Sequence, residues 1–149
     1  MPRRKTHRVL GGVSGAVGAA YTARNESGIG MILESLGGFC GGIMSSVIPD
    51  VIEPAISSWH RSHAHSVAAG TTIAVSGRSI VGEWQEFCRQ KAAYHENIFK
   101  TSNDFLTKLW HGFLIVVWRF LSGLAIGLIL GYLSHLGADL TTRRRIPII

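Results

Sequence analysis

The feature that most constrains this chain is a set of four long apolar blocks, each containing at most one Asp, Glu, Lys or Arg. An α-helix needs about 20 residues to cross the hydrocarbon core of a bilayer, with about 17 as a lower bound. The second and fourth blocks reach this length, whereas the first and third are marginal. We therefore expect an all-α fold: a small polytopic membrane helical bundle with about four transmembrane helices plus an amphipathic helical connection. The blocks are residues 9–23, 27–49, 66–82 and 112–138.

Small residues recur at intervals of four in two of these blocks, so that each set lies on one helix face. In a membrane the hydrophobic effect no longer drives helices together, and faces of small residues let their backbones approach closely. The pattern therefore predicts tightly packed helices. The two ladders are Gly11, Gly15 and Ala19 in the first block and Gly123, Gly127 and Gly131 in the fourth.

Residues 83–111 connect the third and fourth blocks and are polar, with aromatic and aliphatic residues between the polar ones. Several of the apolar residues, including Phe87, Tyr94 and Ile98, fall near helical spacing, which predicts one or two amphipathic helices. The sequence shows no internal repeat. We therefore treat residues 1–149 as a single membrane-embedded domain.

The distribution of charge predicts the topology. The net charge is +6, and basic residues gather at the two ends, in residues 3–8 and 143–145. Basic residues that flank membrane segments mark the cytoplasmic side. With four crossings, both termini and residues 50–65 lie in the cytoplasm, and residues 83–111 lie outside. We expect a multi-pass protein of the inner (plasma) membrane, surrounded by membrane lipids.

Eight ionisable residues lie at the ends of the apolar blocks, and this topology brings all of them to the cytoplasmic face. His135 and Asp139 are separated by four residues, so they can point at one ion from the same helix face. Histidine nitrogen combined with carboxylate oxygen suits zinc, and also manganese or iron, better than calcium. The set is large enough for one or two divalent ions. Its members are His7, Asp50, Glu53, His60, His63, His65, His135 and Asp139.

Four short motifs, in this order, resemble the YdjM-like family of inner-membrane proteins, which is described as membrane-bound metal-dependent hydrolases. The motifs are TH at residues 6–7, PD at residues 49–50, HRSHAHS at residues 60–66 and GYLSHLGAD at residues 131–139. The resemblance covers most of the chain except residues 83–111.

The resemblance implies a narrower set of site residues. Arg61 matches the motif arginine, Ser62 stands where the family prefers glycine, and His63 falls at a variable position. His63 and Glu53 are therefore only additional candidates. The implied metal ligands are His7, Asp50, His60, His65, His135 and Asp139.

The function that follows is a membrane-bound metal-dependent hydrolase of the phosphoesterase type, in which a metal-activated water cleaves a lipid headgroup or a nucleic acid. Arg61 and Asp50 are the predicted catalytic residues, with Arg61 pairing a substrate phosphate. The alternative is a non-enzymatic small membrane protein with a structural metal site, which acts through homo-oligomers or through a partner. A third reading, a metal or proton transporter, needs its ligands at the bilayer midplane, and the ligands here lie at helix ends.

Overall fold

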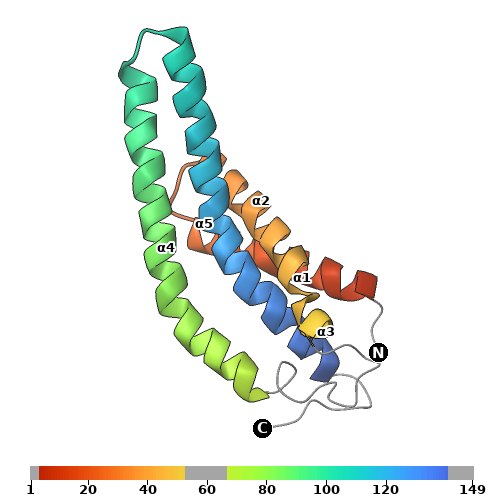
Figure 1. The fold of residues 1–149 in the computed structure, drawn as a ribbon. Helices are drawn as coiled ribbons and strands as arrows, with labels where there is room; N and C mark the ends of the chain where they lie inside the picture. The colour runs from red at the N-terminus through yellow and green to blue at the C-terminus, as the bar shows by residue number, and fades with distance from the viewer. Residues whose placement is uncertain (1–3, 53–66, 141–149) are drawn as a thin grey trace.

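The computed structural model describes residues 4–52 and 67–140, and this part of the chain is all-helical, without a strand (Figure 1). Three of the helices pack against one another in all pairs: α1, α2 and α5. Within the described residues, α4 packs its backbone against α5 alone. The elements are α1 (Arg4–Thr22), α2 (Gly28–Ser45), α3 (Ile48–Ile52), α4 (Val67–Thr101) and α5 (Phe105–Leu140).

Two of the helices begin at side chains that cap them. The Ser27 hydroxyl accepts a hydrogen bond from the Gly30 N–H at 3.1 Å and caps α2. The Asp104 carboxylate caps α5, since it accepts hydrogen bonds from the Thr107 hydroxyl at 2.6 Å and from the Thr107 N–H at 2.8 Å. These two hydrogen bonds, the hydroxyl first, hold the pKa of Asp104 below its ordinary value.

The expected connection between the third and fourth blocks is not a separate element. The third block continues into it without a break as α4, which is 35 residues long, and α5 begins at Phe105, before the fourth block does. The physical reason is that no proline lies between residues 67 and 101, so nothing there stops a helix. The predicted amphipathic helices are therefore the distal parts of two long helices that meet in a hairpin.

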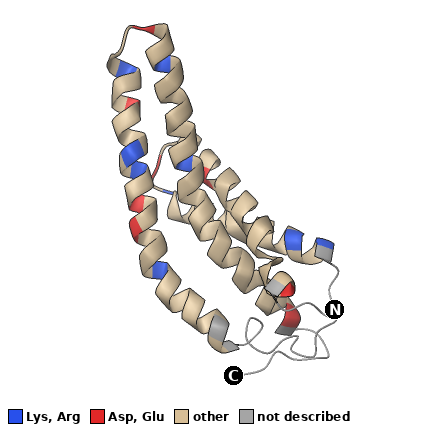
Figure 2. Ribbon diagram, viewed as in Figure 1, with Lys and Arg blue, Asp and Glu red and all other residues tan. Residues whose placement is uncertain are grey.

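Two segments are long and apolar enough to cross a membrane, Gly28–Val51 and Phe105–Asp139; an 18-residue stretch within each has a mean hydropathy of 1.5 and 2.3, respectively. Figure 2 shows that charged residues gather along the distal part of the α4–α5 hairpin and at the opposite end of the bundle, near α3. The all-α prediction is confirmed for the described residues. The two apolar spans support membrane association, and the four crossings stay a prediction.

The predicted small-residue ladders are confirmed as the contact surface of α1, α2 and α5. A Cβ atom on Gly15 would clash with the carbonyl oxygen of Gly38 and would lie 3.1 Å from the Cα of Gly127. A Cβ atom on Gly127 would in turn clash with the Gly38 backbone. The three backbones therefore meet at a point where only glycine fits. The same ladders place Gly11 against Gly42, Ala19 against Gly38, Gly123 against Glu34, and Gly131 against Gly42 and Ser45.

A buried ion network ties α4 to this three-helix core. Glu34 of α2 is 0% exposed and accepts hydrogen bonds from Arg89 at 2.7 and 3.1 Å, from Arg119 at 3.1 Å and from the Ser122 hydroxyl at 2.9 Å. Glu26 pairs with Arg119 at 2.6 Å and with Arg89 at 3.6 Å. Two carboxylates thus balance two guanidinium groups, which is the condition under which charges can be buried.

The glycine contacts predict opposite effects for the same substitution at two sites. Gly127→Ala should lower the free energy of unfolding by about 1–3 kcal/mol, because the added methyl meets the Gly38 backbone. Gly82→Ala, on α4 where a Cβ would meet nothing within 4 Å, should raise stability by up to about 1 kcal/mol through helix propensity. Thermal unfolding in detergent, followed by circular dichroism, measures both; equal shifts of the same sign would contradict this packing.

The ion network predicts a second contrast. Glu34→Ala should cost about 3–5 kcal/mol, because it leaves two guanidinium groups without their shared buried carboxylate. Glu96→Ala removes the exposed partner of Lys100 and should cost less than about 1 kcal/mol. Chemical denaturation of the two variants beside the wild type gives both values. A mild effect at Glu34 would mean that the network contributes little to folding.

Candidate metal centre

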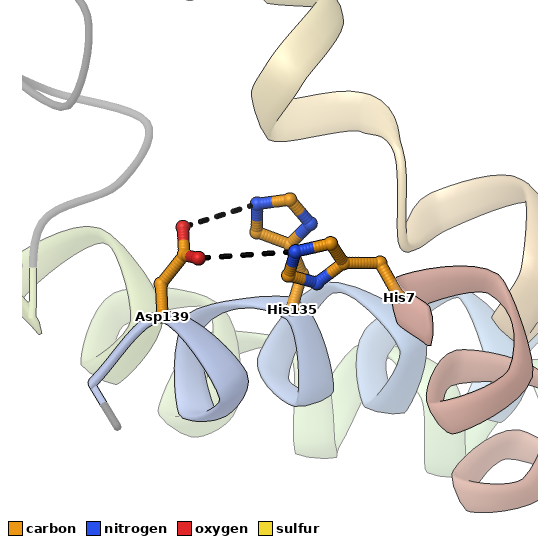
Figure 3. Close-up of side chains that lie close together, drawn as sticks. All are labelled: His7, His135 and Asp139. Carbon is orange, nitrogen blue, oxygen red and sulfur yellow. Dashed lines mark ion pairs between the residues drawn. The ribbon is translucent and has the colours of Figure 1, made fainter. Parts of the chain in front are cut away.

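Three buried side chains from opposite ends of the sequence meet at one end of the bundle. His7 lies in the first turn of α1, and His135 and Asp139 lie one turn apart near the end of α5 (Figure 3). The tight contact of α1 and α5 with α2 sets this meeting, since Gly11 and Gly131 both lie against Gly42. Helix packing thereby brings together His7 and His135, which are more than 120 residues apart in the sequence.

The spacing of the ligand atoms is that of groups around a common ion. Asp139 Oδ1 lies 3.8 Å from His7 Nε2, and Asp139 Oδ2 lies 3.5 Å from His135 Nε2. One ligand atom from each residue can be chosen so that all lie within 4.8 Å of one another. These separations exceed hydrogen-bond lengths of about 2.7–3.2 Å. The two distances to Asp139 are near the roughly 3.3–3.6 Å between neighbouring ligands of a tetrahedral ion with bonds of about 2.0–2.2 Å. The 4.8 Å limit of the group is wider, so the ligands would move closer together around an ion.

A hydrogen bond to the backbone fixes the orientation of the His135 ring. Its Nδ1 lies 2.6 Å from the backbone oxygen of Ser46, and since a carbonyl only accepts, Nδ1–H must be the donor. Its Nε2 lies on the other side of the ring, 3.5 Å from Asp139 and 3.6 Å from Asp50. Two carboxylates beside this nitrogen can be balanced either by a proton on the ring or by a bound cation. An imidazole held by a backbone carbonyl is the usual arrangement of a histidine ligand.

The second imidazole stacks on the first. The ring centroids of His7 and His135 lie 4.0 Å apart with an interplanar angle of 25°. The relative exposures of His7, His135 and Asp139 are 3%, 0% and 3%. Burial of ionisable groups at the end of an apolar bundle is costly and marks a functional or structural site rather than a solvated surface. The arrangement could hold one divalent ion with two nitrogen ligands and one oxygen ligand.

The structure places four of the predicted site residues. It brings His7, His135 and Asp139 together as the compact group. Asp50, in α3, borders the group through its 3.6 Å approach to His135, and its side chain is 25% exposed. The other predicted ligands and catalytic residues lie outside the described residues, and they stay predictions. They are Glu53, His60, Arg61, His63 and His65.

Two structurally important contacts, one at the metal centre and one in the ion network, were not predicted from the sequence. The backbone oxygen of Ser46 orients His135 across 89 residues of sequence, and no side-chain pattern signals a carbonyl partner. Arg89 was assigned to the outer connection, yet it reaches Glu34 inside the bundle. The signal available for Arg89 was the single acidic residue in the second block, which required a buried basic partner.

Fold and site together define an all-helical protein with two apolar candidate spans and a buried histidine–aspartate cluster that could hold a metal ion. No family model, no curated protein and no solved structure matches the chain. The resemblance to the YdjM-like family therefore stays a prediction based on the four motifs.

The geometry predicts that zinc stabilises the folded protein through these residues. At a free Zn²⁺ concentration of 100 times Kd, the free energy of unfolding should rise by about 2.7 kcal/mol. His135→Ala should abolish the rise, because it removes one of the three ligands. His95→Ala, at a histidine on the distal part of α4, should keep it. Thermal unfolding at increasing Zn²⁺ concentrations measures the stabilisation of the wild type, His135→Ala and His95→Ala. Equal stabilisation of the wild type and His135→Ala would mean that zinc binds at another site.

Proposed function

We propose that this protein is a membrane-bound metal-dependent hydrolase of the phosphoesterase type, with its site at the cytoplasmic face. The observation that carries the proposal is the buried group of His7, His135 and Asp139, with ligand atoms at the spacing of a common ion. The basic residues at 3–8 and 143–145 support the cytoplasmic assignment. In the sequence, the first cluster surrounds His7 and the second follows Asp139 by a few residues, and basic residues that flank apolar helices mark the cytoplasmic side.

Each of the described residues at the site would have a separate role in binding the metal ion. His7 and His135 provide imidazole nitrogens, Asp139 provides a carboxylate oxygen, and the Ser46 carbonyl holds the His135 ring in position. Three protein ligands are the usual number at a catalytic zinc site, where the fourth position is open. A divalent ion in this place, zinc being our first choice and manganese or iron the others, would lower the pKa of a bound water and polarise a phosphoryl oxygen.

Asp50 is the described residue best placed to accept a proton. Its carboxylate borders the group, 3.6 Å from His135 Nε2, and it is more exposed than the three buried side chains. It can therefore reach a water or substrate that approaches from the open side, whereas Asp139 faces inward. We assign Asp50 as the general base or as an additional ligand. Arg61, from the sequence alone, is assigned to pair a substrate phosphate through its planar guanidinium group.

The proposed substrate class is a phosphoester, either a lipid headgroup or a nucleic acid. The argument is chemical, since histidine–carboxylate metal sites with an open position activate water for phosphate ester cleavage. The ligand types are also similar to those of the zinc-dependent phospholipase C and nuclease group. The four motifs that resemble the YdjM-like hydrolases support the same reaction class.

The proposal predicts hydrolysis that depends on both metal and Asp50. The Zn²⁺-loaded protein in detergent should cleave a chromogenic phosphodiester, and Asp50→Asn should lower kcat by about 10²–10⁴-fold, as expected for loss of a general base. If Asp50 is the general base, the variant should keep its zinc, because His7, His135 and Asp139 are unchanged; a loss of zinc together with activity would make Asp50 a ligand instead. Turnover is measured by product absorbance and metal content by elemental analysis. Bound zinc without turnover on diesters, phospholipid vesicles or oligonucleotides would refute the enzymatic assignment.

A second function, a structural metal site, is favoured by one specific observation. The three ligands are almost fully buried, with exposures of 0–3%, and closed sites are typical of structural rather than catalytic zinc. In that case the ion joins the start of α1 to the end of α5 and stabilises the bundle. Zinc then raises stability as above while no substrate is turned over, so the two functions differ in the outcome of the hydrolysis experiment.

A further inference from the structure

An apolar stripe on α5 continues beyond the helix that covers its lower part. The part of α5 nearer its C-terminal end faces α2. There Phe120 lies against Gly37, Leu124 against Gly41, and Gly127 against Gly38. These positions follow a repeat of seven residues, with steps of three and four. Nearer the start of α5, four apolar residues show their own alternation of steps of three and four: Leu106, Leu109, Phe113 and Val116.

The continued stripe has lost its cover because α2 begins only at Gly28. The exposures of Leu106, Leu109, Phe113 and Val116 are 71%, 61%, 56% and 45%. Phe105 and Trp110 flank the stripe and are 74% and 59% exposed. We name these six residues the distal stripe. Contiguous exposed apolar patches of this kind mark interaction sites.

The lengths of the helices place the distal stripe outside a bilayer that covers α2. At about 1.5 Å per residue, the 18 residues of α2 span about 27 Å, close to the roughly 30 Å of hydrocarbon in a bilayer. The 36 residues of α5 span about 54 Å. The distal part of the α4–α5 hairpin extends well beyond α1 and α2 (Figure 1). Beyond Arg89, which pairs with Glu34 of α2, α4 carries three of its seven charged residues, Lys91, Glu96 and Lys100, and these favour water over lipid (Figure 2).

The other side of the hairpin is already occupied. His111 of α5 lies with its Nδ1 2.8 Å from Nδ1 of His95 on α4, and Gly112 lies against the Phe99 ring. The contact with α4 thus uses positions of α5 that are outside the distal stripe. Since α4 takes that face, the stripe remains available to a different helix.

We propose that the distal stripe is the contact surface for a second copy of this chain. Apolar residues at steps of three and four form the seam with which two helices of identical sequence pack as a coiled coil. Both copies of a membrane protein keep the same orientation, so a twofold axis along the membrane normal brings each α5 parallel to its partner, with Leu109 facing Leu109.

Charge supports self-association at this place. The whole chain carries +6, which would make two copies repel each other. Residues 83–111 are an exception, since their four acidic residues balance their four basic ones. No charged residue interrupts the distal stripe itself. Two hairpins can therefore approach without strong net repulsion, and the start of α1, which carries Lys5 and Arg8, lies away from the contact (Figure 1).

Cysteine cross-linking of the full chain in lipid vesicles tests the proposed contact. Cys40 and Cys88 are first replaced by Ala, and then Leu109→Cys is introduced. Oxidation should convert the protein into covalent dimers, because the parallel seam places the two thiols face to face. Tyr94→Cys is the matched control: Tyr94 is 62% exposed and lies in the same hairpin, but on α4. Equal cross-linking at both positions would reflect random collision and overturn the proposal.

The mass of the protein in detergent provides the second measurement. The wild type should have the mass of two chains, and Leu109→Glu combined with Phe113→Glu should have the mass of one. Both side chains are exposed in the single chain, so the helix content by circular dichroism should not change. Tyr94→Glu should remain a dimer. A wild type that is monomeric in detergent and does not cross-link in vesicles, or a dimer that survives the double substitution, would show that something other than a second copy covers the stripe.

Discussion

The contact on which the structure depends is the meeting of three backbones at Gly15, Gly38 and Gly127. Each of these glycines lies where a Cβ would strike a neighbouring helix, so α1, α2 and α5 approach more closely than any larger residue permits. Close approach maximises dispersion contacts, which matters most where lipid replaces water and the hydrophobic effect no longer drives association. The apolar composition provides helices, and the glycine ladders determine which faces meet.

The position of the metal centre follows from these ladders. Once Gly11 and Gly131 are both set against α2, the first turn of α1 and the last turns of α5 must lie at the same end. His7 then stacks on His135, and Asp139 lies beside both. The ligands need no local motif that holds them together, because the helix packing does so. A substitution in the glycine contact far from the centre would therefore displace the ligands as well as the helices.

Much of the fold could be predicted from the sequence, because apolar blocks and small-residue spacing are local signals. The helices and the two ladders belong to this class, and so does the i, i+4 spacing of His135 and Asp139; the meeting of His7 with them was predicted from the topology and the resemblance instead. The continuity of the third block with its polar extension as one helix, α4, is not visible from the sequence, because a change in polarity looks like a boundary although only a helix-breaking residue makes one. The Ser46 carbonyl and the Arg89–Glu34 pair could not be predicted by spacing, since they depend on which helices become neighbours. Which helices become neighbours depends on how their surfaces pack, and local sequence patterns do not specify this.

The two polar clusters divide the molecule by role. Glu34 and Ser46 lie on the same helical segment, separated by 12 residues or about 18 Å, so the ion network and the metal centre are at opposite ends of the glycine contact. Among the described residues, α4 provides Arg89 to the network but none of the three metal ligands. The centre thus rests on α1, α2 and α5, while the network anchors the base of the α4–α5 hairpin. α4 also contacts α5 below this level, with Gly70 against Leu136 and Gly77 against Ile129, so the part of the hairpin beyond the network is the part that extends past α1 and α2 and is separate from the ligands (Figure 1).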